Sequence, residues 1–117
     1  MGNWVISEGC TIDEQSIEHN VIRENKPIHL SPSCWKLLIA LLDAKKHKRG
    51  LSYDNIGQIL WPKEGGWDEA RKDTLKKKLD EIKRAIGTDS INNTYGIGYS
   101  LAGEIKELKS KNTGDGM

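Results

Sequence analysis

The stretch from residue 70 to residue 86 carries seven cations against three anions, and cations gathered on one element can bind a polyanion. The cations are Arg71, Lys72, Lys76, Lys77, Lys78, Lys83 and Arg84, and the anions are Asp73, Asp80 and Glu81. This stretch therefore has a net charge of +4, whereas the whole chain of 117 residues has +1 and the remainder −3. The distribution of the charge, rather than its total, points to a polyanionic partner.

An amphipathic helix is predicted to position these cations. Apolar residues recur with helical spacing at Leu75, Leu79, Ile82 and Ile86. Asp68 is the expected N-cap, and Gly87 is the expected stop. At about 100° per residue, the side chains of Asp73, Lys77 and Arg84 point directly away from the apolar stripe. Only the narrow stripe can pack on a core, so the lysine-rich side must face solvent or a partner.

A lysine-rich helix face also has a plainer interpretation, because such faces are often simply solvated. Asp80 and Glu81 have the spacing to pair with Lys76, Lys77 and Arg84 along the helix. The basic run at residues 45–49 has the same two interpretations, since it can be solvated or can touch a phosphate backbone.

No catalytic, metal or cofactor chemistry is predicted, and we do not expect an enzyme. His19, His29 and His47 are far apart in unlike elements, and no nucleophile lies in a recognisable pattern with a base. Cys10 and Cys34 lack the short spacing of a metal site, and we expect them to be buried thiols in a reducing compartment. No apolar run is long enough to span a membrane, and no secretory signal is present at the N-terminus.

The remaining elements are predicted in a definite order. Residues 3–30 alternate in short apolar clusters typical of strands, including one from Ser16 to Ile22. A helix follows, capped by Ser31, and a short second helix capped by Ser52 ends before Pro62. After the lysine-rich helix, residues 90–94 and 99–101 form a hairpin. We expect one folded domain over residues 1–103 and a polar linker or disordered tail over residues 104–117.

This order of elements resembles the OmpR/PhoB-type winged-helix domain. The matching residues are Ile28-His29-Leu30-Ser31, Leu37-Leu38, Leu51-Ser52, Ile59-Leu60-Trp61 and Asn93-Thr94-Tyr95-Gly96-Ile97-Gly98-Tyr99-Ser100-Leu101. The last piece is similar to the family's T-x-x-G-x-G-Y-x-L pattern, with one residue fewer between Thr94 and Gly96. The resemblance implies an α+β winged helix-turn-helix fold with an N-terminal antiparallel sheet, three helices and a C-terminal β-hairpin wing.

The resemblance also implies sequence-specific binding of double-stranded promoter DNA, with the helix at about residues 68–86 in the major groove. On that basis the candidates for base contacts are Asp73, Thr74, Lys77 and Lys78. The candidates for phosphate contacts are Arg71, Lys72, Lys76, Lys83 and Arg84. In the wing at residues 90–101 the candidates are Asn92, Asn93, Thr94, Tyr95 and Tyr99, and Tyr99 could equally pack between wing and helix.

Two features depart from the family pattern. Ile82-Lys83 replaces the usual Leu-Arg, and the wing turn holds Tyr95 and Ile97 where the family often has a cation. The loop at residues 61–67 corresponds to a segment that contacts RNA polymerase in some members. Lys63, Glu64 and Trp67 are the candidates there, although Trp67 could instead be tucked against its own helix. The alternative function is a winged-helix protein–protein interaction module without DNA binding.

Family resemblance further implies a bacterial transcription regulator in the cytoplasm. We expect no receiver domain before the module, an arrangement similar to the ToxR/CadC subgroup, in which a membrane helix follows. The chain is then either a free-standing regulator or the cytoplasmic part of an inner-membrane protein. We expect a monomer that pairs head to tail on DNA, and no small-molecule ligand.

Overall fold

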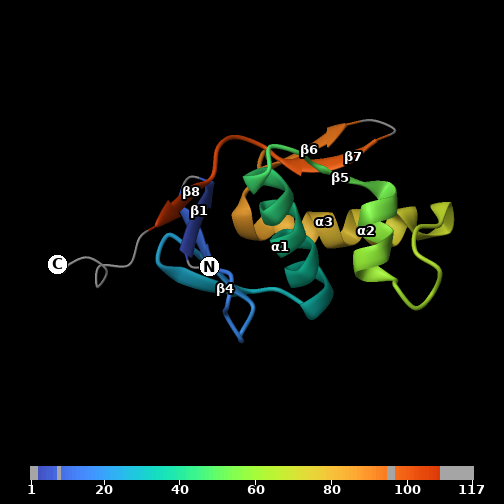
Figure 1. Cartoon of the computed structure of the whole chain (residues 1–117). Coiled ribbons are helices and arrows are strands. Elements are labelled where there is room, and N and C mark those ends of the chain that lie inside the picture. Colours follow the sequence, from blue (N-terminus) through green and yellow to red (C-terminus); the bar gives the residue numbers. More distant parts are fainter. Residues whose placement is uncertain (1–2, 8, 95–96, 109–117) are drawn as a thin grey trace.

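A computed structural model describes residues 3–7, 9–94 and 97–108, and two antiparallel sheets flank three helices in it. The first sheet begins with β1 (Asn3–Ser7), β2 (Cys10–Asp13), β3 (Asn20–Arg23) and β4 (Lys26–His29). These strands pair in sequence order, and β8 (Lys106–Leu108) joins β1 at the other edge. Figure 1 shows this sheet at the end of the molecule that holds both described termini.

The helices follow the sheet, and α1 (Pro32–Lys46) leads through β5 (Leu51–Ser52) into α2 (Tyr53–Leu60). The α2 cap is the predicted one, because the Ser52 side chain accepts from the Asn55 N–H and the Asn55 side chain accepts from the Ser52 N–H. A 3₁₀ turn, η1 (Glu69–Arg71), precedes α3 (Lys72–Ile86). Asp68 caps this 3₁₀ turn by accepting from the Ala70 N–H, so the α-helix starts later than the predicted Asp68.

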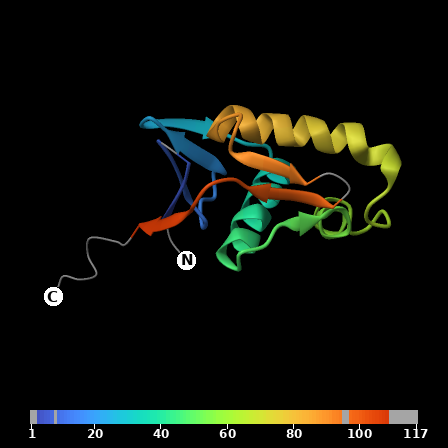
Figure 2. The ribbon, with the colours of Figure 1, turned by 90° about the horizontal axis from the view of Figure 1, so that it is seen from above.

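The second sheet contains the predicted hairpin, formed by β6 (Ile91–Thr94) and β7 (Gly98–Leu101), with β5 paired to β7. Figure 2 shows β6 running back from the end of α3 towards the α2 side of the molecule. The core lies between α1, α3 and the two sheets. Its fully buried residues include Leu37, Leu38, Leu41, Leu42, Ile56, Leu75, Leu79 and Ile82.

The first sheet differs from the predicted one at two strands. Lys106–Leu108 form a strand instead of a linker, with Val5 opposite Lys106 and Asn3 opposite Leu108. All three residues of β8 are exposed, so backbone pairing rather than burial forms the strand, and hydropathy carries no trace of it. The strand expected from Ser16 begins only at Asn20, because a turn occupies the earlier residues and leaves Ile17 91% exposed.

Candidate nucleic-acid interface

The apolar stripe of α3 anchors the helix as the spacing predicted. Its buried residues are Leu75, Leu79, Ile82, Ala85 and Ile86, all no more than 2% exposed. Arg23 of β3 makes a hydrogen bond to the C-terminal end of α3, since its guanidinium donates to the Arg84 carbonyl at 3.2 Å. The helix is therefore fixed along one side and open along the other.

The open side of α3 holds most of the predicted contact residues. The exposed ones are Lys72, Asp73, Thr74, Lys76, Lys77, Asp80 and Arg84, and Lys83 is half-buried. Among the described residues, no ion pair joins an α3 cation to a carboxylate, and the single pair found there is Lys46–Glu14. The helical pairing that would favour a merely solvated face is thus not formed. Lysines without a carboxylate partner keep their full charge available to an external anion.

Lys78 is held differently from its neighbours. It is half-buried, and its Nζ donates to the Ser33 Oγ of α1 at 2.8 Å. The Cys34 Sγ lies 3.5 Å from the Lys78 carbonyl, so two consecutive residues of α1 contact the same point of α3. Of the four predicted base-contacting residues, Lys78 is the one that the protein itself already engages.

Glu81 provides a second link between α1 and α3, which no local sequence pattern predicts. The Ser31 side chain makes no cap hydrogen bond, and the Ser31 N–H instead donates to the Glu81 carboxylate at 3.0 Å. That hydrogen bond is the largest cause holding the pKa of Glu81 below its usual 4.5. Ser31 and Glu81 are 50 residues apart, so no local motif predicts this contact.

The contact predicts a pH-dependent loss of stability in Glu81→Gln. A lowered folded-state pKa means that the carboxylate stabilises the fold above its unfolded pKa, and that this contribution disappears as pH falls through the folded pKa. We expect a loss of about 1 kcal/mol at neutral pH, typical of a partly exposed charged hydrogen bond. The difference from the parent should shrink towards about pH 3.

Urea denaturation at both pH values measures this effect, and Asp80→Asn is the matched control. Asp80 is exposed on the same helix, so its neutralisation should change stability by less than about 0.5 kcal/mol. An equal loss at both pH values in Glu81→Gln would contradict the assigned role.

Arg71 organises the loop before α3. Its guanidinium donates to the carbonyl of Gly66 and, at 3.1 Å, to that of Glu64, and it lies 5.3 Å from the Trp61 ring. This placement differs from the predicted phosphate contact, because the half-buried side chain points into its own loop. Arg71 points into the loop because the carbonyls of Gly66 and Glu64 accept hydrogen bonds from its guanidinium.

The loop residues predicted to meet RNA polymerase differ in exposure. Lys63 and Glu64 are exposed, whereas Trp67 is half-buried. The Trp67 ring lies 4.9 Å from Tyr53 and 6.3 Å from Trp61, so the loop rests on α2 through aromatic contacts. Trp67 therefore packs against its own domain, which is the second of the two positions expected for it.

The hairpin holds Asn92 and Asn93 exposed, while Tyr95 and the Thr94 side chain lie outside the described residues. Tyr99 is 7% exposed and packs edge-on against Tyr53, with ring centroids 5.9 Å apart. Burial, with Tyr53 beside it, raises the pKa of Tyr99 to about 12. This position matches the packing alternative given for Tyr99, and a hydrogen bond from Tyr99 to DNA stays a prediction.

Ile97 was not among the predicted contact residues, yet it is 64% exposed at the end of the hairpin. Its carbonyl accepts from the Tyr53 N–H at 3.2 Å, which ties the hairpin to the start of α2. An exposed isoleucine in a turn was visible in the sequence, where it stands in place of a cation.

Two solved structures are similar to this fold. The C-terminal domain of NsrR, described as a lantibiotic response regulator and nisin resistance regulator, is 28% identical, with a TM-score of 0.56. That match covers 80% of this chain and 90% of the NsrR domain. The DNA-binding domain of E. coli CadC is 14% identical, with a TM-score of 0.66, and 92% of this chain and 98% of that chain are covered. The chain has the OmpR/PhoB-type winged-helix fold.

The winged-helix assignment confirms the fold class predicted from the order of elements. The hairpin β6–β7 stands at the place of the predicted wing. No protein-family model and no curated protein matches the sequence. Within the described ranges, no helix of the winged-helix domain is long and apolar enough to cross a membrane. The same ranges contain no group of three potential metal-ligating side chains.

Proposed function

We propose that this winged-helix domain binds double-stranded DNA in a sequence-specific manner as part of a bacterial transcription regulator. The observation that carries the proposal is the open face of α3, where Lys72, Lys76, Lys77 and Arg84 are free of carboxylate partners in the described structure. An α-helix fits the major groove, and free cations on it can replace counterions along the phosphates. The DNA-binding domain of CadC and the response regulator NsrR, both similar in fold, support this assignment.

Roles within α3 follow from exposure. Asp73, Thr74 and Lys77 are exposed on the first half of the helix and are proposed to contact bases. Lys78 can join them by exchanging its hydrogen bond with Ser33. Lys72, Lys76, Lys83 and Arg84 are proposed to contact phosphates.

The wing and the loop are assigned supporting roles. Asn92 and Asn93 are proposed to contact the DNA backbone or the minor groove. The exposed Lys63 and Glu64, with the accessible part of Trp67, form the candidate contact with RNA polymerase. We further propose a cytoplasmic location, head-to-tail pairing on DNA, and kinship with ToxR-like regulators.

The proposal predicts that Lys76→Ala/Lys77→Ala weakens DNA binding about tenfold or more in low salt. Each lost phosphate contact also lowers the slope of log affinity against log salt by about 0.9. Gel retardation of mixed genomic fragments at several salt concentrations measures both quantities. Neither residue contacts the core, so the variant should fold normally.

Lys26→Gln/Lys106→Gln is the matched control, because both lysines are exposed in the first sheet and the same charge is removed. It should bind nearly as well as the parent. If the parent retards no fragment even at low salt, the proposal fails and the interaction-module alternative is favoured. If the α3 variant binds as the control does, α3 is not the recognition helix.

A further inference from the structure

A second group of cations lies at the end of α1, away from α3. The first turn of α1 contacts α3 through Ser31 and Ser33, whose partners are Glu81 and Lys78. From Ser33, α1 then runs for about 12 residues, about 18 Å at 1.5 Å per residue, before it reaches the basic run at residues 45–49. Figure 2 shows this end of α1 on the opposite side of the molecule from α3. A duplex lying on α3 cannot also cover the run.

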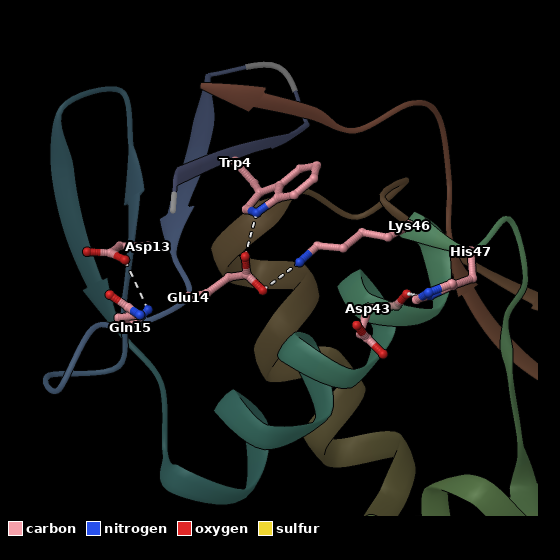
Figure 3. Close-up of polar contacts among 7 residues, drawn as sticks. All are labelled: Trp4, Asp13, Glu14, Gln15, Asp43, Lys46 and His47. Carbon is pink, nitrogen blue, oxygen red and sulfur yellow. Dashed lines mark hydrogen bonds and ion pairs between the residues drawn. The ribbon is translucent and has the colours of Figure 1, made fainter. Parts of the chain in front are cut away.

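The run divides into one paired cation and several unpaired ones. Lys46 donates to the Glu14 carboxylate at 2.7 Å and lies 4.5 Å from the Trp4 ring centroid, as Figure 3 shows. Trp4 donates to the same carboxylate at 2.6 Å. Lys45, Lys48 and Arg49 have no carboxylate partner among the described residues, and they line a shallow hollow with Gly50 and Ser100. Lys45, Lys48 and Arg49 thus line one hollow, whereas the charge of Lys46 is neutralised by Glu14.

Capping of α1 does not explain these cations. Two carbonyls at the end of the helix are already satisfied by the backbone, since Ala44 accepts from the N–H groups of His47 and Arg49, and Lys45 accepts from that of Lys48. Lys48 also has φ of +60°, where helices usually place glycine. A side chain there costs about 1 kcal/mol or more, which the helix dipole, at about 0.3–1 kcal/mol, at best offsets. Helix capping and the helix dipole therefore provide no net stabilisation that would account for a lysine at residue 48.

We propose that Lys45, Lys48 and Arg49 form a second phosphate-binding surface, which holds another DNA segment while α3 holds the first. The hollow has no large apolar side chain among its lining residues, whereas protein interfaces have apolar centres and few lysines. Phosphate contacts need only cations, hydroxyls and N–H groups. The inference rests on the proposed function of α3, and it makes a single domain able to bridge two duplexes.

A bead assay tests the bridging directly. One duplex is fixed to beads, the protein is added at low salt, and retention of a second, labelled duplex is measured. The decisive variant is Lys48→Gly/Arg49→Gln, which removes two charges and gives residue 48 the amino acid that its backbone favours. The parent should retain the labelled duplex. The variant should bind a single duplex within about twofold of the parent but no longer retain the labelled duplex.

Each result has one meaning. The control Lys26→Gln/Lys106→Gln should bridge as the parent does. Bridging that survives in Lys48→Gly/Arg49→Gln, or binding of one duplex without bridging by the parent, overturns this inference and leaves the role of α3 intact. Retention of polyglutamate in place of the second duplex, dependent on Lys48 and Arg49, assigns the surface to an acidic protein and also overturns it. A parent that binds no duplex at all contradicts the proposed function itself.

Discussion

Gly57→Ala is expected to destabilise the domain by about 2–3 kcal/mol, the reverse of what helix propensity predicts. Alanine in place of glycine within a helix normally stabilises it by about 1 kcal/mol. Gly57 lies in the middle of α2, but a Cβ there would stand 2.2 Å from the Trp67 nitrogen and 2.6 Å from the Trp67 Cα. Both atoms belong to the backbone, so no side-chain rotation can relieve the overlap, and the loop must move.

The displaced loop would carry its contacts with it. Trp67 packs on Tyr53, and Arg71 holds the loop to the start of α3 through the carbonyls of Glu64 and Gly66. We therefore expect weaker DNA binding as well as a lower midpoint of urea denaturation. Gln58→Ala is the matched control, because Gln58 is exposed on the same helix and its replacement should cost less than about 0.5 kcal/mol. A Gly57→Ala protein more stable than the parent would refute the close approach of loop and helix.

Local patterns in the sequence predict most of the helices and strands. The helical spacing of Leu75, Leu79 and Ile82 marks the buried side of α3, and the cap at Ser52 is formed as expected. Such signals work because periodicity and capping depend on residues within a few positions of one another. They fail for β8, whose residues Lys106–Leu108 are all exposed and pair through their backbone with β1, about a hundred positions earlier.

The candidate site shows the same division. Charge and helical phase were enough to place Lys76, Lys77 and Arg84 on the open face. Arg71 and Lys78 are equally cationic and were assigned to the same partner, yet each is engaged by a different part of the protein. A sequence shows where a charge is along the chain but not which carbonyl or hydroxyl competes for it. Intramolecular partners such as Ser33 depend on tertiary packing, which local pattern does not contain.

Ile82→Ala is expected to cost about 2–5 kcal/mol, a large part of the stability of a domain this size. Ile82 is 0% exposed on the buried stripe of α3, so the substitution removes buried methyl groups and leaves a cavity. Urea denaturation followed by circular dichroism measures the loss. The neighbouring Lys83→Ala, at a half-buried position on the same turn, should cost far less.

This variant also separates the scaffold from the proposed contact surface. Ile82 faces away from Lys76 and Lys77, so the molecules that remain folded should keep the parent's salt slope for DNA binding. Lowering the temperature or adding a stabilising osmolyte should then restore the binding lost through unfolding. Lys76→Ala/Lys77→Ala should show the opposite behaviour, with a reduced slope that no stabilising condition repairs. A reduced salt slope of DNA binding in folded Ile82→Ala would contradict this separation. The apolar side and the charged side of α3 would then not act independently.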